Sequence, residues 1–194
     1  AFTQLRQLFS DDGTPLHNYA SYLGVADLAA AAVRADRGME GSDVIEHALS
    51  RLDGRASARL GQLIARARGI LAGPDEAEAH FATALADPAG DQWPFERAQL
   101  RLDYAEWLRR RRRINDAKPV LTEALGTFQR LGARSWVQRA QAELRACGVA
   151  VTGAPAARSA SSARFELPHI TNCGVPFMKS ITGSFSMTCS IWSR

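Results

Sequence analysis

The chain has 194 residues, which is enough for one ordinary domain or a short repeat array that folds without disulfides or metal ions. Its net charge of +4 favours anionic partners but is far below the charge density of a dedicated nucleic-acid-binding arm. Cys147, Cys173 and Cys189 are odd in number and suggest neither a disulfide framework nor a zinc site. The lack of a long apolar run or signal peptide predicts a cytoplasmic chain that does not associate with membranes.

The first predicted hairpin lies near the amino terminus. Apolar residues recur at steps of three and four along 17–36, which predicts one amphipathic helix. Its buried face is expected to comprise Tyr22, Val25, Leu28, Ala29, Ala32 and Val33. Gly38 and Gly41 are expected to break this helix, and a second helix is expected to begin at Ser42 as its N-cap and to run to Leu52.

Two further hairpins and a last helix follow. Helices are expected at 58–71, 74–85, 95–112, 115–132 and 133–147. Pro74 and the acids after it are typical of a helix start, and Asn115 is expected to cap the helix that follows it. Because no run before residue 148 alternates with the period of a strand, the sequence predicts an all-α domain over residues 1–148.

The hairpins repeat along the chain. A shift of 40 residues matches small residues with small and large with large. The matched pairs are Leu60 and Leu100, Ile64 and Tyr104, Ala65 and Ala105, Ala77 and Ala117, Phe81 and Leu121, Ala84 and Ala124, and Leu85 and Leu125. A shift of 36 residues aligns Leu28, Ala29 and Ala48 with Ile64, Ala65 and Ala84. Such a period is typical of a helical solenoid.

Alanine at a helix crossing lets two antiparallel backbones approach closely, which explains why the small positions recur. The pattern resembles the tetratricopeptide repeat (TPR), although its period is longer and Gly61 and Arg101 stand where that repeat usually has tryptophan. We therefore predict TPR-like antiparallel hairpins that stack as a short α-solenoid.

Five consecutive arginines, Arg109–Arg113, suggest either a nucleic-acid-binding site or the solvated end of a helix. Successive helical side chains are about 100° apart, so five of them sweep more than a full turn and cannot form one stripe. In the repeat register, Arg109 and Arg110 fall in the last turn of a helix, where cations favour the helix dipole, and the others fall in the following turn. The solvated helix end is favoured over an anion or partner site, and direct DNA binding is expected to be weak and salt-sensitive.

No motif for nucleotide binding, zinc proteases or serine hydrolases occurs, so we expect no enzyme activity, no metal and no cofactor in this chain. The histidines are scattered and are expected to be surface or groove residues and not ligands; these are His17, His47, His80 and His169. The carboxylates are expected on solvated faces or in pairs with arginines; these are Glu76, Glu78, Asp103, Glu106 and Glu123. Trp107 and Trp136 are expected in the core or in hairpin contacts, and Cys147 is expected to be inert.

Residues 95–148 carry a more specific pattern, with the segments ERA, YAEWLRR, LGA and AELRA at characteristic positions. This stretch resembles the C-terminal helical-repeat region of large, ATPase-containing LuxR-family transcriptional regulators of actinobacteria, and 26–37 and 74–85 are similar to its earlier hairpins. The resemblance implies a signal-transduction ATPase with a terminal helix-turn-helix for promoter DNA. ATP would bind the family's N-terminal domain, and promoter DNA its helix-turn-helix; this chain matches neither.

The composition changes after the helical region. Residues 149–167 are expected to be a flexible linker. Residues 168–194 replace the family's helix-turn-helix with a segment rich in Ser, Thr, Ile, Phe, Met and Cys. We expect this segment to be largely unstructured after a frameshift, truncation or fusion near residue 167. Because the chain also starts without methionine, we expect a fragment of a longer protein.

The sequence thus predicts a helical-repeat fragment of a LuxR-family regulator that recognises a protein partner or a small-molecule inducer. The alternative is a free-standing TPR-like adaptor without promoter function. By resemblance to TPR grooves, polar residues of the first helix of each hairpin are candidates to face a ligand: Arg59, Gln62, Arg66, Gln99, Asp103, Glu106 and Arg109.

Overall fold

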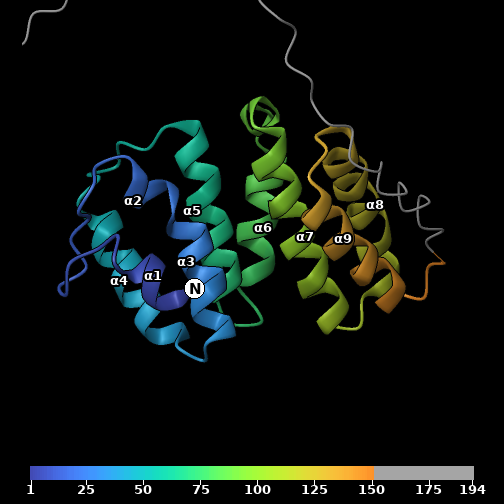
Figure 1. Cartoon of the computed structure of the whole chain (residues 1–194), viewed down its shortest axis with the longest axis horizontal. Coiled ribbons are helices and arrows are strands. Elements are labelled where there is room, and N and C mark those ends of the chain that lie inside the picture. Colours follow the sequence, from blue (N-terminus) through green and yellow to red (C-terminus); the bar gives the residue numbers. More distant parts are fainter. Residues whose placement is uncertain (151–194) are drawn as a thin grey trace, which may run out of the picture. The chain divides into compact units, whose positions relative to one another are not determined.

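The computed structural model describes residues 1–150, and this part of the chain is built from helices (Figure 1). Nine α-helices and one 3-10 helix follow one another within it: α1 (Phe2–Arg6), α2 (Ala20–Leu23), α3 (Val25–Arg34), α4 (Gly38–Ser50), α5 (Ala58–Leu71), α6 (Ala77–Ala86), η1 (Pro88–Gln92), α7 (Pro94–Arg110), α8 (Ile114–Arg130) and α9 (Arg134–Ala146). These residues contain no strand, and only an isolated bridge joins Phe9 to Pro15. The predicted all-α class is confirmed.

The predicted carboxyl-terminal segments lie almost wholly outside the described residues. This applies to the linker at 149–167 apart from its first two residues, and to the whole of 168–194.

The prediction of one continuous helix over 17–36 is wrong. The chain forms α2 and α3 instead, and Gly24 separates them. A side chain at Gly24 would lie 2.8 Å from the Cδ1 atom of Leu8, so the break lies where the amino-terminal segment packs closely on the helices. Most of the predicted apolar face of α3 is buried, but Val33 is 41% exposed.

The prediction that α4 begins at Ser42 is also wrong, because α4 begins at Gly38 and Ser42 lies inside it. Gly41 therefore does not break a helix. It lies at the crossing of α3 and α4, where an added Cβ atom would lie 2.5 Å from the Cβ atom of Ala32. The two helices can approach this closely only because position 41 has no side chain.

The later helices agree more closely with the predicted boundaries. Helix α5 has the predicted bounds, and its N-cap is Ser57, whose hydroxyl accepts a hydrogen bond from the backbone N–H of Leu60 (3.2 Å). Helix α6 begins at Ala77, three residues later than Pro74, because residues 74–76 form a turn before the helix.

Asn115 does not cap α8, which was the prediction. It is the second residue of the helix, and Arg113 takes the N-cap position without a side-chain hydrogen bond. The tight turn leaves no room for a separate cap. Arg112 adopts a left-handed conformation (φ 62°), and the N–H of Arg113 donates to the carbonyl of Leu108 at the end of α7 (2.9 Å).

The alanines of the repeat pattern are buried between helices, as the small positions require. Five of them are at most 5% exposed: Ala77, Ala84, Ala105, Ala117 and Ala124. Ala65 is half-buried and packs against the cluster around Phe81. Gly69 supplies a further small position, since a Cβ atom there would lie 2.8 Å from the Phe81 ring.

Helices that follow one another pack together from α3 to α9, and α3 also packs on α5 and α5 on α7. Trp107 and Trp136 are half-buried in this packing, as predicted: Trp107 stacks on Tyr104, and Trp136 packs on Phe95 and Phe128. Among the described residues, no helix combines the length and hydrophobicity needed to span a lipid bilayer.

Candidate functional site

The predicted groove residues lie along the facing sides of α5 and α7. Arg59, Gln62 and Arg66 are three and four residues apart on α5 and so share one face of that helix. Gln99, Asp103 and Glu106 have the same spacing on α7. We call the surface formed by these sides of α5 and α7, together with the adjoining parts of α3 and α9, the first-helix face.

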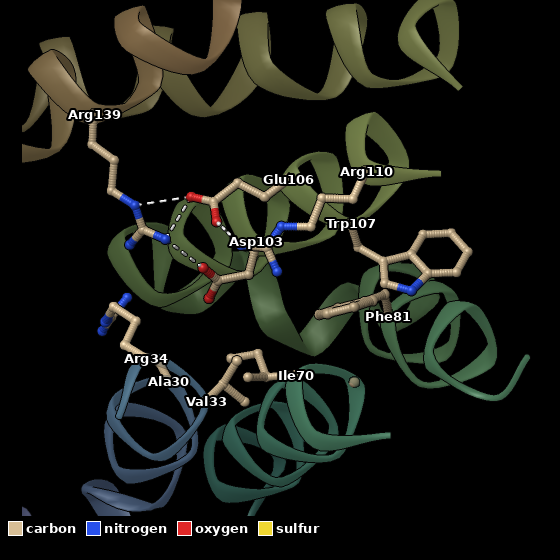
Figure 2. Close-up of a pocket in the computed structure, with 11 residues that line it drawn as sticks. Ala30, Val33, Arg34, Ile70, Phe81, Asp103, Glu106, Trp107, Arg110 and Arg139 are labelled. Carbon is tan, nitrogen blue, oxygen red and sulfur yellow. Dashed lines mark hydrogen bonds and ion pairs between the residues drawn. The ribbon is translucent and has the colours of Figure 1, made fainter. Parts of the chain in front are cut away.

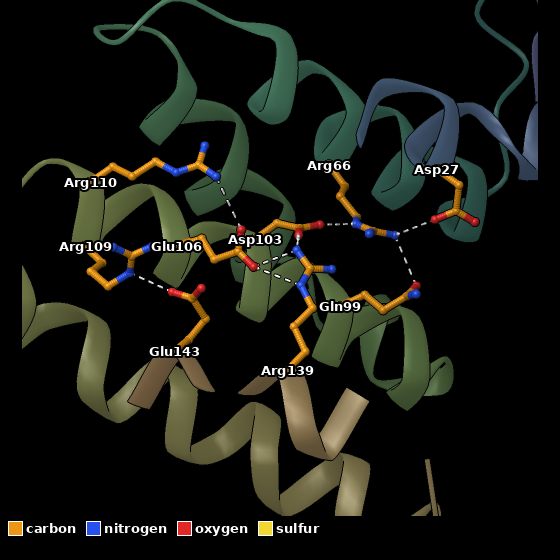
Figure 3. A network of polar contacts seen from close by, with 9 residues as sticks. All are labelled: Asp27, Arg66, Gln99, Asp103, Glu106, Arg109, Arg110, Arg139 and Glu143. Atoms are coloured by element: carbon orange, nitrogen blue, oxygen red, sulfur yellow. Dashed lines mark hydrogen bonds and ion pairs between the residues drawn. The ribbon is translucent and has the colours of Figure 1, made fainter. Parts of the chain in front are cut away.

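Arg66 lies at the centre of the first-helix face and is 2% exposed. Its Nε atom donates to the Oδ2 atom of Asp103 (2.7 Å), and its Nη1 atom donates to the Oε1 atom of Gln99 (3.1 Å). Its Nη1 atom also lies 3.6 Å from a carboxylate oxygen of Asp27 on α3 (Figure 3). One buried guanidinium thus joins three helices.

A second arginine extends these contacts to α9. Arg139 donates from Nη2 to Asp103 (3.1 Å) and from Nε and Nη2 to Glu106 (2.9 and 2.6 Å). Asp103 therefore lies between two guanidinium groups, one from α5 and one from α9. Arg109 adds a separate link between α7 and α9, since its Nε atom donates to Glu143 (2.6 Å).

Four of these residues form what we call the charge ladder: Asp27, Arg66, Asp103 and Arg139. Their charges alternate in sign, and each residue is about one hairpin further along the chain than the one before it, as Figure 3 shows for the three contacts. Removing a buried charge from water costs several kcal/mol, and only close oppositely charged partners offset that cost. The ladder therefore fixes which first helices lie beside one another.

The carboxylates of α7 are partners of arginines, as predicted, but Asp103 and Glu106 are not on a solvated face. Their side chains are only 6% and 14% exposed. Burial raises the pKa of Glu106 despite the attraction of Arg139, and the negative charge of Asp103 adds to the rise. The charged form of Glu106 is therefore less favourable in the folded protein than in water, because the arginine beside it does not fully offset the cost of burial.

Arg59 and Gln62 complete the predicted set on α5. Arg59 forms an ion pair with Glu96 at the start of α7. Gln62 is buried, and neither its amide nitrogen nor its carbonyl oxygen has a hydrogen-bond partner within the described residues. It packs against Gly90 of η1, where an added Cβ atom would lie 3.0 Å from the amide nitrogen.

A small pocket opens beside the charge ladder (Figure 2). Its cavity volume is about 70 Å³. Polar lining residues come from α3, α7 and α9: Arg34, Asp103, Glu106, Arg110 and Arg139. The rest of the lining is apolar and consists of Ala30, Val33, Gly69, Ile70, Phe81 and Trp107. Of the predicted residues, the pocket brings together Asp103 and Glu106, whereas Arg59, Gln62, Arg66, Gln99 and Arg109 lie outside its lining.

The five arginines lie where the repeat register placed them. Arg109 and Arg110 are in the last turn of α7, and the next three residues form the turn before α8. Arg113 donates to both carboxylate oxygens of Glu78 (2.7 and 2.8 Å), and Arg111 lies 3.5 Å from Asp75. The run therefore makes contacts on different sides of the turn and forms no single cationic stripe.

Sequence reasoning missed several residues of this site: Asp27, Arg34, Glu96, Arg139 and Glu143. The signal that could have found most of them is a charge of opposite sign about one hairpin away from a predicted groove residue. Elsewhere, Cys147 is buried and its burial raises the pKa of the thiol, which lowers its reactivity. No group of His, Cys, Asp and Glu within residues 1–150 is arranged to hold a metal ion.

Comparison with known proteins returned no match for this chain among family models, curated proteins or solved structures.

Proposed function

We propose that residues 1–150 are a TPR-like helical-repeat domain of a LuxR-type transcriptional regulator, and that its first-helix face recognises a protein partner or an inducer. The hairpins α3–α4, α5–α6 and α7–α8 are the repeats of a short solenoid, and α9 is the helix that ends it. The resemblance of residues 95–148 to the LuxR family and the buried small positions support this proposal.

The main support for the proposal is that residues from α3, α5, α7 and α9 together form one polar network and line one pocket. These helices hold corresponding positions in successive hairpins. A ligand on this face would contact several hairpins at once, so its binding energy would depend on how they are stacked.

Burial divides the predicted groove residues into two groups, with Glu106, whose side chain is 14% exposed, between them. Arg66, Gln62, Gln99 and Asp103 are at most 7% exposed and support the face from within. The side chains of Arg59 and Arg109 are 32% and 29% exposed and are accessible from solvent. We expect a partner to contact the exposed group, while the buried group holds the helices in register.

The outer side of α9 supports its place as a terminal helix. Its exposed residues include Arg134, Gln138 and Arg145, whereas Ala140 and Leu144 are buried against the preceding hairpin. A polar outer surface is what the terminal unit of a helical repeat requires, because no further hairpin covers it.

Partner affinity tests the recognition face. The full chain is used to recover a partner, and the affinity of Arg110→Ala is compared with that of Arg130→Ala. The Arg110 side chain is 64% exposed at the pocket, whereas Arg130 is exposed on α8. We expect Arg110→Ala to weaken binding by about tenfold or more, as arginines at the centre of interfaces do. Arg130→Ala should leave the affinity unchanged, and equal effects of the two substitutions would contradict the assignment.

The sequence of the gene on either side of this chain tests whether the chain is part of a LuxR-type regulator. We expect the reading frame upstream of Ala1 to encode an ATPase with a GxxxxGK[ST] motif, and DNA downstream to encode a helix-turn-helix. If neither is present, the free-standing TPR-like adaptor is the better description.

A further inference from the structure

We propose that the pocket on the first-helix face binds the carboxylate of a small organic acid that carries a short apolar group. The proposal rests on the proposed function of this face as a recognition surface, and it names the class of ligand. It follows from the charges, the apolar wall and the size of the pocket.

The pocket carries an excess of positive charge. Three arginines line it, against the two carboxylates of Asp103 and Glu106. Asp103 also neutralises Arg66, which lies behind it at 2.7 Å. The carboxylates are thus already paired, and a further cationic ligand would have to displace an arginine. An anion would displace none.

Two of the arginines have donors available for that anion. Arg34 from α3 and Arg139 from α9 both line the pocket, and their guanidinium groups lie on the same side of the view in Figure 2. In Figure 2 no hydrogen bond or ion pair joins Arg34 to the other lining residues drawn. Arg139 uses Nε and Nη2 for Glu106 and Asp103, which leaves Nη1 without a carboxylate. Two guanidinium groups that line the same pocket repel one another, and an anion bound between them would offset that repulsion.

Arg110 lies on the far side of Glu106 and adds to the positive field. Its Nη2 atom is 3.6 Å from Glu106, which is a long contact, and its side chain is 64% exposed. The side chain can therefore turn toward a ligand without breaking a short hydrogen bond.

The apolar wall selects an organic anion over a simple hydrated one. Val33, Ile70 and Trp107 line the same pocket as the arginines, and Val33 is exposed although it belongs to α3's apolar side. Covering Val33 and the adjoining wall with an alkyl or aromatic group removes apolar surface from water, at roughly 25 cal/mol per Å². Inorganic phosphate offers no such group and would lose its hydration against this wall.

The size of the pocket limits the ligand. A cavity volume of about 70 Å³ is far below the roughly 300 Å³ or more of pockets for drug-sized molecules. A planar carboxylate fits the fork of donors on two guanidinium groups, and a short branched chain or one ring fits the wall. Isovalerate and benzoate are suitable probes.

The test is an NMR titration of the full chain that follows the indole N–H signal of Trp107, identified by its loss in Trp107→Phe. We expect isovalerate or benzoate to shift this signal saturably, and neutral isovaleramide not to do so. Arg34→Gln should weaken acid binding by about tenfold or more, because a charge-assisted hydrogen bond is lost. Arg145→Gln removes the same charge from an exposed position on α9 and should leave binding unchanged.

The proposal is overturned if neither acid gives a saturable shift, if isovaleramide or inorganic phosphate binds as tightly as the acids, or if Arg34→Gln binds as well as the unchanged chain. Its failure can be told apart from failure of the proposed function. If the acids do not bind but Arg110→Ala still weakens partner binding, the ligand class is wrong and the recognition face stands. If both experiments fail, the face itself is assigned wrongly.

Discussion

The contact between Arg66 and Asp103 gives the sharpest stability prediction. Their side chains are 2% and 6% exposed and lie 2.7 Å apart between α5 and α7. We consider two apolar substitutions of similar size, Arg66→Met and Asp103→Leu, alone and together. The single changes remove one charge from a buried pair, whereas the double change removes both.

The two single changes differ in what they leave behind. Asp103→Leu leaves the Arg66 guanidinium buried with Gln99 and with Asp27 at 3.6 Å, a carboxylate that is 55% exposed. We expect this change to destabilise the fold by about 3 kcal/mol, the lower end of the range for an unpaired buried charge. Arg66→Met leaves Asp103 with Arg139 at 3.1 Å, so we expect a smaller loss of about 2 kcal/mol.

The double variant leaves no unpaired charge at the centre of the ladder, because Arg139 keeps its hydrogen bonds to Glu106. We expect its free energy of unfolding to lie within about 1 kcal/mol of that of the unchanged chain. The assay is urea unfolding of all four proteins, followed by far-UV circular dichroism. The double-mutant cycle should give a coupling free energy of about 3 kcal/mol or more, and a coupling below about 0.5 kcal/mol would refute the reasoning.

Three further predictions concern stability. Gly61→Ala should stabilise α5 by about 0.5–1 kcal/mol, because no atom lies within 4 Å of the added Cβ atom. Gly69→Ala should destabilise α5 by about 1 kcal/mol or more, because its Cβ atom would lie 2.8 Å from the Phe81 ring. Equal effects of the two substitutions in urea unfolding would exclude tight packing at position 69. The pKa of Glu106 in the folded protein is raised above 4.5, so the contribution of Glu106 to the free energy of unfolding should fall as the pH rises past that value. Glu106→Gln should therefore become more stable relative to the unchanged chain in unfolding curves measured from pH 4 upward. A relative loss of stability over this range would contradict the prediction. Arg112→Gly should raise the free energy of unfolding by about 1 kcal/mol, since glycine adopts the φ of 62° without steric cost, and calorimetry showing no gain would count against the strained turn.

Sequence patterns predicted the later hairpins well because each has strong local signals. The period of apolar residues, the serine at position 57 and the recurring alanines act within one helix or one hairpin. The errors came where a residue's role depends on another helix. Gly41 resembles a helix breaker, but it is a packing position against Ala32, and Gly24 marks a break set by contact with Leu8.

Only part of the candidate site could be predicted from the sequence. The resemblance to TPR grooves made Arg66 and Asp103 candidates for one face, and the structure brings these two side chains together. Sequence spacing within a helix could not show that they are buried partners of Asp27 and Arg139, because those contacts join different hairpins. Nor could it show that Arg34 and Arg139 line the same pocket.

The central claim is that the first-helix face, and not the surface of α4, α6 and α8, is where this domain recognises its ligand. The most direct measurement is site-specific photo-crosslinking with a photoreactive residue placed at Arg34, or at the exposed Thr83 of α6 or Thr122 of α8. The account predicts cross-linking of the recovered partner or inducer from position 34 and none above background from positions 83 and 122. Cross-linking from positions 83 or 122 with none from position 34 would contradict it.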